Sequence, residues 1–155
     1  MKRYLVLLLL SFCFPICLLA QVPDTDFGFS YALLPKGNQT SIQSDGTITF
    51  PDATVNLVNS AQSQTTSATF VITNRGTRSG VVNNIISTGG VFRLSGVPLL
   101  PVAVQPNQTL TFTIDFQPTQ LGGASGALRI DLQKAVNFSL AGNGVGSVLA
   151  YEFTV

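Results

Sequence analysis

Strict alternation of apolar and polar residues is the feature that most constrains the fold of this chain. It is clearest in residues 110–116, where leucine, phenylalanine and isoleucine alternate with threonine and aspartate. Because successive side chains of an extended backbone point to opposite faces, this segment is predicted to be a β-strand with one face in a core and the other in water. The same alternation recurs in residues 47–50, 55–57, 68–72, 128–132 and 136–140.

Turn-forming residues separate these segments. Glycine, asparagine and proline cluster at 74–76, 89–90, 106–107, 122–123 and 142–144, and these residue types favour chain reversal. Asp45-Gly46, between Ile42 and Ile48, is the strongest short-range signal for a β-hairpin. Short strands at a spacing of about ten residues, without a sustained helical period after residue 20, predict an antiparallel sandwich or barrel.

Two prolines, Pro98 and Pro101, interrupt the apolar segment 97–102. Because proline cannot donate a hydrogen bond to a sheet, this segment is predicted to be an edge or a connection crossing between sheets. Most phenylalanines fall on the same phase as isoleucine and leucine. They are therefore predicted to pack in the core rather than to form an aromatic binding platform.

The first twenty residues have the pattern of a secretory signal peptide. Lys2 and Arg3 precede an uncharged apolar run that ends at Ala20, directly before polar Gln21. Pro15 interrupts this run short of the ~20 residues that a membrane-spanning helix needs, so a retained anchor is the weaker interpretation. We expect cleavage near Gln21 and an extracellular, cell-surface or periplasmic location.

Both cysteines, Cys13 and Cys17, lie inside this predicted signal peptide, and the whole chain has no histidine. Neither cysteine follows the small residue that bacterial lipid attachment requires, because Phe12 and Ile16 precede them. The expected mature chain can build neither a Ser-His-Asp nor a Cys-His site, and neither a thiolate nor an imidazole metal site. We therefore expect no catalytic residue, no cofactor-binding residue and no metal ligand.

Charge gives a second exclusion. Removing Lys2 and Arg3 from the eight cations leaves six against seven anions, a net charge of −1. Nucleic acid binding needs clustered lysine and arginine to neutralise phosphates, and Arg75, Arg78 and Arg93 form no dense patch in the sequence. Nucleic acid is therefore not an expected partner.

The order of the strand and turn motifs resembles a known family. The motifs are FVITNRGT at 70–77, VQPNQTLTF at 104–112, FQP at 116–118, GALRI at 126–130 and FSLAGNG at 138–144. This order is similar to that of the immunoglobulin-like ASH family, named for the abnormal spindle protein, a spindle-pole protein and hydin. The family resembles the major-sperm-protein and PapD-type sandwiches and the choice-of-anchor repeats of bacteria.

The resemblance spans roughly residues 46 to 146 and implies an all-β, antiparallel immunoglobulin-like sandwich. In it, Asn74 with Gly76 turns the chain after a core strand, Pro106 with Asn107 makes the next turn, and residues 142–144 close the last strand. The sequence departs from the pattern at 131–135, where DLQKA replaces the Ser-Asn-Asp type of turn. Eukaryotic members are associated with cilia and centrosomes, a setting that a signal peptide contradicts, so the resemblance implies a fold and a scaffold-like role alone.

Several polar groups invite a chemical interpretation. Asp24-Thr25-Asp26 could supply calcium ligands but lacks further carboxylates, so a solvated linker is favoured. Asp115 and Asp131 could pair like glycosidase carboxylates, but their outward phases on separate strands favour ordinary surface residues. The N-glycosylation pattern occurs at Asn38, Asn107 and Asn137; the bacterial origin that the repeat resemblance implies makes these chance matches.

The predicted organisation has four parts. Residues 1–20 are the signal peptide, 21–45 an N-terminal linker and first strand, and 46–146 the ASH-like domain. Residues 147–155 are predicted to open a following repeat, because the segment around Tyr151 resembles the one around Tyr31. The expected function is that of a non-catalytic structural or interaction module of an exported bacterial repeat protein, with other modules as partners. A carbohydrate- or peptide-binding module is the alternative, and an enzyme or enzyme accessory domain is the least favoured class.

Overall fold

The structure is a computed structural model that describes residues 26–55 and 63–146. Within these residues every regular element is a β-strand, and no helix able to span a membrane is found. The strands are β1 (Phe27–Leu33), β2 (Thr40–Ile42), β3 (Thr47–Thr49), β4 (Ala53–Val55), β5 (Thr66–Asn74), β6 (Gly80–Val82), β7 (Asn84–Ser87), β8 (Phe92–Ser95), β9 (Val102–Val104), β10 (Thr109–Phe116), β11 (Gly122–Asp131) and β12 (Val136–Gly146).

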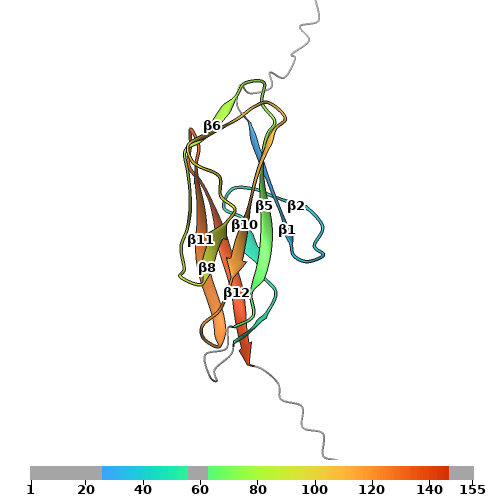
Figure 1. Cartoon of the computed structure of the whole chain (residues 1–155), viewed down its shortest axis with the longest axis vertical. Helices are drawn as coiled ribbons and strands as arrows, with labels where there is room; N and C mark the ends of the chain where they lie inside the picture. The colour runs from blue at the N-terminus through green and yellow to red at the C-terminus, as the bar shows by residue number, and fades with distance from the viewer. Residues whose placement is uncertain (1–25, 56–62, 147–155) are drawn as a thin grey trace, which may run out of the picture.

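Two sheets form the layers of a sandwich (Figure 1). One has the strand order β2-β1-β5-β10-β8, and the other has the order β3-β12-β11-β7, with β4 also paired to β12. A short ribbon of β6 and β9 lies apart from both sheets. All pairings are antiparallel except those of β3 and β4 with β12.

Phenylalanines from both sheets meet between the layers. Phe70 of β5 lies 5.3 Å from Phe112 of β10, measured between ring centroids, and 5.2 Å from Phe138 of the facing β12. A second group joins Phe116 to Phe92, with ring centroids 5.1 Å apart. The predicted inward phase of residues 110–116 is confirmed, and so is the prediction that most phenylalanines pack in the core. Aromatic pairs at these separations add to the stability that burial alone provides.

The predicted hairpin at Asp45-Gly46 is wrong. Asp45 adopts a φ of 66°, as a tight turn requires, but β2 and β3 on its two sides belong to opposite sheets. The turn is held by the facing strand: the Asp45 amide donates to the Asn137 carbonyl oxygen at 2.7 Å, and the Ser139 amide donates to the Gly46 carbonyl oxygen at 2.9 Å. The turn residues specify a local reversal, whereas the pairing partner is chosen by distant residues.

The glycines predicted to stop a strand at 142–144 instead lie inside β12, whereas Gly122 and Gly123 are the first two residues of β11. Gly142 lies against the ring of Phe116, where a Cβ atom would come within 2.6 Å of ring atoms. Gly144 lies so close to the Gln120 carbonyl oxygen that a Cβ atom would collide with it. At positions 142 and 144 glycine is required for close approach, and β12 continues through both.

The N-terminal strands are part of the sandwich. β1 pairs with β5 along its whole length, from Phe27 opposite Asn74 to Leu33 opposite Ala68, and β2 pairs with β1. The folded unit therefore includes β1 and β2, which precede the predicted boundary at residue 46. The predicted signal peptide at 1–20 and the predicted opening strand at 147–155 lie outside the described residues.

Candidate functional site

Strand β10 has two neighbours along its second half and one along its first half. β5 pairs with all of it, whereas β8 pairs with the part from Thr113 to Phe116. β8 ends at Ser95, and Gly96 follows with a φ of 68°, a left-handed conformation that turns the chain out of the sheet. At residues 109–112, β10 therefore has no neighbouring strand on the β8 side within the described part of the chain.

The hydrogen-bond pattern identifies the open backbone groups. On the β5 side, the Asn74 amide donates to the Gln108 carbonyl oxygen at 3.0 Å. On the β8 side, the Gln117 amide donates at 2.9 Å to the carbonyl oxygen of Val91, the residue before β8. Because backbone groups alternate in direction along an antiparallel strand, the even-numbered residues bond to β5 and the odd-numbered ones face β8. Thr109 and Thr111 therefore direct their N–H and C=O groups into the open side, where no described residue bonds to them.

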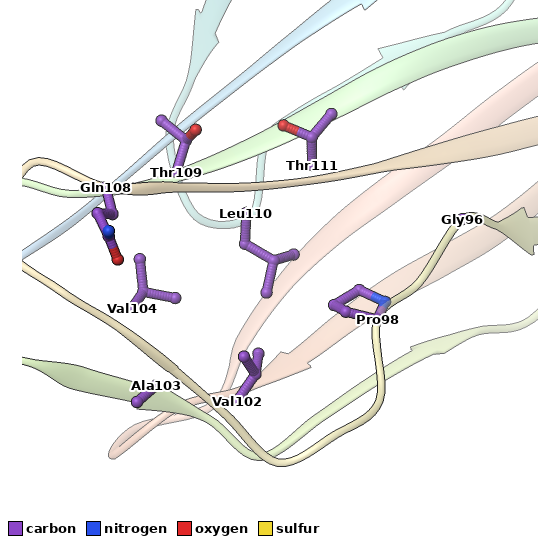
Figure 2. Close-up of a pocket in the computed structure, with 9 residues that line it drawn as sticks. All are labelled: Gly96, Pro98, Val102, Ala103, Val104, Gln108, Thr109, Leu110 and Thr111. Atoms are coloured by element: carbon purple, nitrogen blue, oxygen red, sulfur yellow. The ribbon is translucent and has the colours of Figure 1, made fainter.

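A cavity of about 280 Å³ adjoins this open edge. Figure 2 shows that Leu110 points into it from β10 and that Val102 and Val104 face Leu110 from the other side. The side chains of Thr109 and Thr111 point away from it. No charged residue lines the cavity, so its chemistry is that of an apolar side-chain pocket beside unpaired backbone groups.

The proline-containing segment forms the outer wall of the cavity. It connects β8 to β9, so the predicted connection is found, but it leads to the short ribbon and not to the facing sheet. Pro98 and Val102 both line the cavity. Leu99, next to Pro98, is 94% exposed, the most exposed large apolar side chain of the described residues. A fully solvated leucine beside an apolar cavity marks this wall as a surface suited to apolar contact.

Asn74 holds the cavity wall against the sheet. Its side chain is fully buried, and its amide nitrogen donates to the carbonyl oxygens of Arg78 and Val104, both at 2.8 Å. Its side-chain oxygen accepts a hydrogen bond from the Gly76 amide at 2.9 Å. The predicted turn at Asn74 and Gly76 is confirmed, and the bond to Val104 ties β9 to the end of β5, a link that no local pattern indicates.

The candidate carboxylate pair does not exist. Asp115 lies on β10 and accepts hydrogen bonds from the hydroxyls of Ser67 (2.6 Å) and Ser95 (2.8 Å). Asp131 ends β11 in the other sheet and pairs with Arg129 at 2.7 Å. Since both carboxylates lie on outward phases of opposite layers, they share no cleft in which a glycosidic bond could be cleaved.

The other polar candidates lie apart from the cavity. Asp26 is exposed, Asp24 and Thr25 fall outside the described residues, and no cluster of three metal-ligating side chains occurs within the described part. The asparagines of the three glycosylation patterns, Asn38, Asn107 and Asn137, are all exposed.

The three arginines do not gather at one site. The guanidinium of Arg75 lies over Gly28, Arg78 follows in the same loop, and Arg93 lies opposite Asp115 in the β8–β10 register.

No curated protein matches this chain. Among solved structures, an ASH/PapD-like domain of human CEP192 (PapD-like domain 7) is similar at 12% identity and a TM-score of 0.45, covering 96% of this chain and 100% of that one. The Vibrio cholerae VesB protease is similar at 9% identity and a TM-score of 0.39, covering 65% of this chain and 31% of that one. Residues 46–142 match the family described as the HYDIN/CFA65/VesB-like, Ig-like domain, so the chain belongs to this family of immunoglobulin-like domains.

Proposed function

We propose that this protein is a non-catalytic interaction module, exported as part of a secreted or cell-surface repeat protein and bound there to other modules or proteins. The observation that carries the proposal is the open half of β10 with its adjoining uncharged cavity. A sandwich that leaves strand-edge groups unpaired beside an apolar pocket offers a surface for a partner chain. Family membership allows this role but does not select it, because immunoglobulin-like folds serve many functions. The proposal therefore rests on the site.

The polar side chains support a non-catalytic role. Asp115 and Asp131 are each engaged by neighbouring side chains in separate layers. The chain has no histidine, and its two cysteines fall in the segment predicted to be removed on export. General acid–base and nucleophilic catalysis usually use a histidine, a cysteine or a pair of carboxylates in one cleft. Among the described residues, Asp115 and Asp131 do not form such a pair.

Peptide is favoured over glycan as the ligand. Sugar-binding modules stack aromatic rings on sugar rings, but the exposed large apolar residues of the described part are Leu34, Val81, Ile86, Leu99 and Leu121, with no aromatic among them. Unpaired backbone groups, by contrast, match the hydrogen-bonding pattern of another extended chain. Glycan remains the second candidate class, and nucleic acid is not proposed.

The proposal is tested with the mature protein purified from its host. Mass spectrometry should find an N-terminus within a few residues of Gln21 and no lipid on a cysteine; retention of residues 1–20 would contradict export. The purified protein, used as bait against the host's exported proteins and on a glycan array, should capture protein and leave the array blank. Specific glycan capture without protein capture would replace the proposed partner class with the alternative.

A further inference from the structure

We propose that the open half of β10 is a strand-addition site, which binds an uncharged extended peptide segment antiparallel to β10 and in line with β8. The segment inserts one branched apolar side chain into the cavity between β10 and β9. This inference rests on the proposed role as an interaction module, and it specifies where and how that module takes its partner.

The hydrogen-bonding groups define an extended chain as the occupant. Thr109 and Thr111 together present two N–H donors and two C=O acceptors, spaced as in a strand, to the side where β8 is missing. Those four groups alternate in the order that an antiparallel backbone satisfies, and neither a sugar nor a globular surface reproduces that order. An added strand would extend the β8–β10 pairing by one hydrogen-bonded pair at each threonine.

The register then places one peptide side chain in the cavity. A peptide residue opposite Leu110 shares its face of the sheet, because directly opposed residues of paired strands point to the same side. Leu110 points into the cavity, so its partner would enter the same space and meet Val102 and Val104 (Figure 2). A cavity of about 280 Å³ accepts an aliphatic side chain.

Charge selects against other peptides. With no charged residue in the lining, a carboxylate or ammonium placed there would lose hydration without gaining a counter-charge. The exposed Leu99 on the neighbouring wall adds an apolar contact for the same partner. The preferred segment is therefore neutral, with an isoleucine, valine or leucine between two residues of high strand propensity.

The probe is a blocked five-residue peptide, acetyl-Ser-Thr-Ile-Thr-Ser-amide, titrated to millimolar concentration into the ¹⁵N-labelled protein. The amide signals of Thr109 and Thr111 should shift in a saturable way, and their hydrogen exchange should slow. The same peptide with aspartate in place of isoleucine should bind at least about tenfold more weakly, because its charge would enter the cavity.

Two proline variants form a matched pair. Thr111→Pro removes a donor that faces the open side and leaves the bonds to β5 intact, so peptide binding should weaken about three- to tenfold, the worth of one backbone hydrogen bond. Thr49→Pro removes an equivalent outward donor from β3 in the other sheet, since the neighbouring Phe50 amide is the one that bonds to β12. Binding to this variant should equal that of the wild type.

A third variant does not depend on proline. Gln108→Glu adds a carboxylate to an exposed side chain that lines the cavity, where it can still accept the hydrogen bond from the Gln105 amide, and should weaken binding of the isoleucine peptide. Absence of shifts at Thr109 and Thr111, equal binding of the aspartate peptide, or shifts confined to the outer strands β2 or β7 would each overturn the site. Partner capture from the host by wild type and Gln108→Glu alike would overturn the site while leaving the proposed function standing. Capture by neither, with peptide binding intact, would overturn the function alone.

Discussion

The two halves of β10 have the same sequence pattern and different surroundings. In the second half, Ile114 and Phe116 point into the core, and the strand is paired on both sides. In the first half, Leu110 and Phe112 also point into the core, but one edge is open and a cavity adjoins it. The comparison teaches that alternation determines which face of a strand is buried but carries no information about which edge is paired.

The cause of the difference lies in the neighbouring strand. Gly96, at a φ of 68°, and Pro98 end β8 after four residues, so the chain that would have covered Thr111 and Thr109 runs along the cavity wall instead. In the covered half, Asp115 accepts hydrogen bonds from serines of both flanking strands. The open half is flanked by β5 alone, because β8 does not extend beside it.

The largest effect is expected from a charge in the covered half. Ile114→Asp would bury a carboxylate with no partner in a fully buried position, at a cost on the order of 5 kcal/mol, comparable with the stability of a whole domain. The variant should be unfolded at room temperature. Thr113→Asp, one residue away on the outer face, should change the free energy of unfolding by about 0.5 kcal/mol or less. Circular dichroism melts compare the two, and equal losses would contradict the inward phase.

A smaller loss is expected at the link between the sheet and the cavity wall. Asn74→Ala removes the partners of three backbone groups, those of Gly76, Arg78 and Val104, and should destabilise the protein by about 3 kcal/mol. Urea denaturation gives the free energy. Because the Val104 bond ties β9 to β5, the variant should also alter the amide signals of the cavity lining. A cost below ~0.5 kcal/mol would mean that water replaces the asparagine without loss.

Packing should differ between the covered and open halves. Gly142→Ala would push a methyl group into the ring of Phe116 and should cost about 1–3 kcal/mol. Val102→Ile instead adds a methyl group beside the cavity under the open half, where space exists, and should change stability by less than about 0.5 kcal/mol. Thermal melts of the two variants test this, with Gly123→Ala as the control because nothing lies near its added Cβ atom. Equal costs would show that both halves are packed alike.

The last test leaves the stability of the protein unchanged, because it needs no mutation. Hydrogen exchange followed by NMR should show the Thr111 amide exchanging orders of magnitude faster than the Thr113 amide, since one faces the open side and the other faces β8. Leu110 and Phe112, which bond to β5, should be protected like Thr113. Slow exchange at Thr111 in the isolated protein would show that its amide already has a partner.

Much of the fold could be read from local patterns because they report local physics. The period of two in residues 110–116 identified both the strand and its buried face, and the phase of the phenylalanines placed most of them in the core. Asn74 with Gly76 was recognised as a turn, because an asparagine side chain can bond to a backbone amide two residues on. The order of such motifs was enough to indicate the family that residues 46–142 match.

The errors share one physical origin. Asp45-Gly46 does reverse the chain, but the strands on its two sides joined different sheets because their partners, β1 and β12, lie far away in sequence. The glycines at 142 and 144 look like turn residues in sequence, yet they lie within β12 because Phe116 and Gln120 approach them from another strand and loop.

The candidate site was the least accessible to local reasoning. A strand edge is open only relative to a neighbour, so the unpaired groups of Thr109 and Thr111 exist because β8 stops where it does. The sequence by itself determined the strands that show a period of two, their buried faces, the turn at Asn74 and Gly76 and the absence of histidine chemistry, since all of these depend on residues close together or on composition alone. The tertiary structure decided which strands pair, which glycines are crowded and where an edge stays open, because those properties arise from contacts between segments that no local pattern encodes.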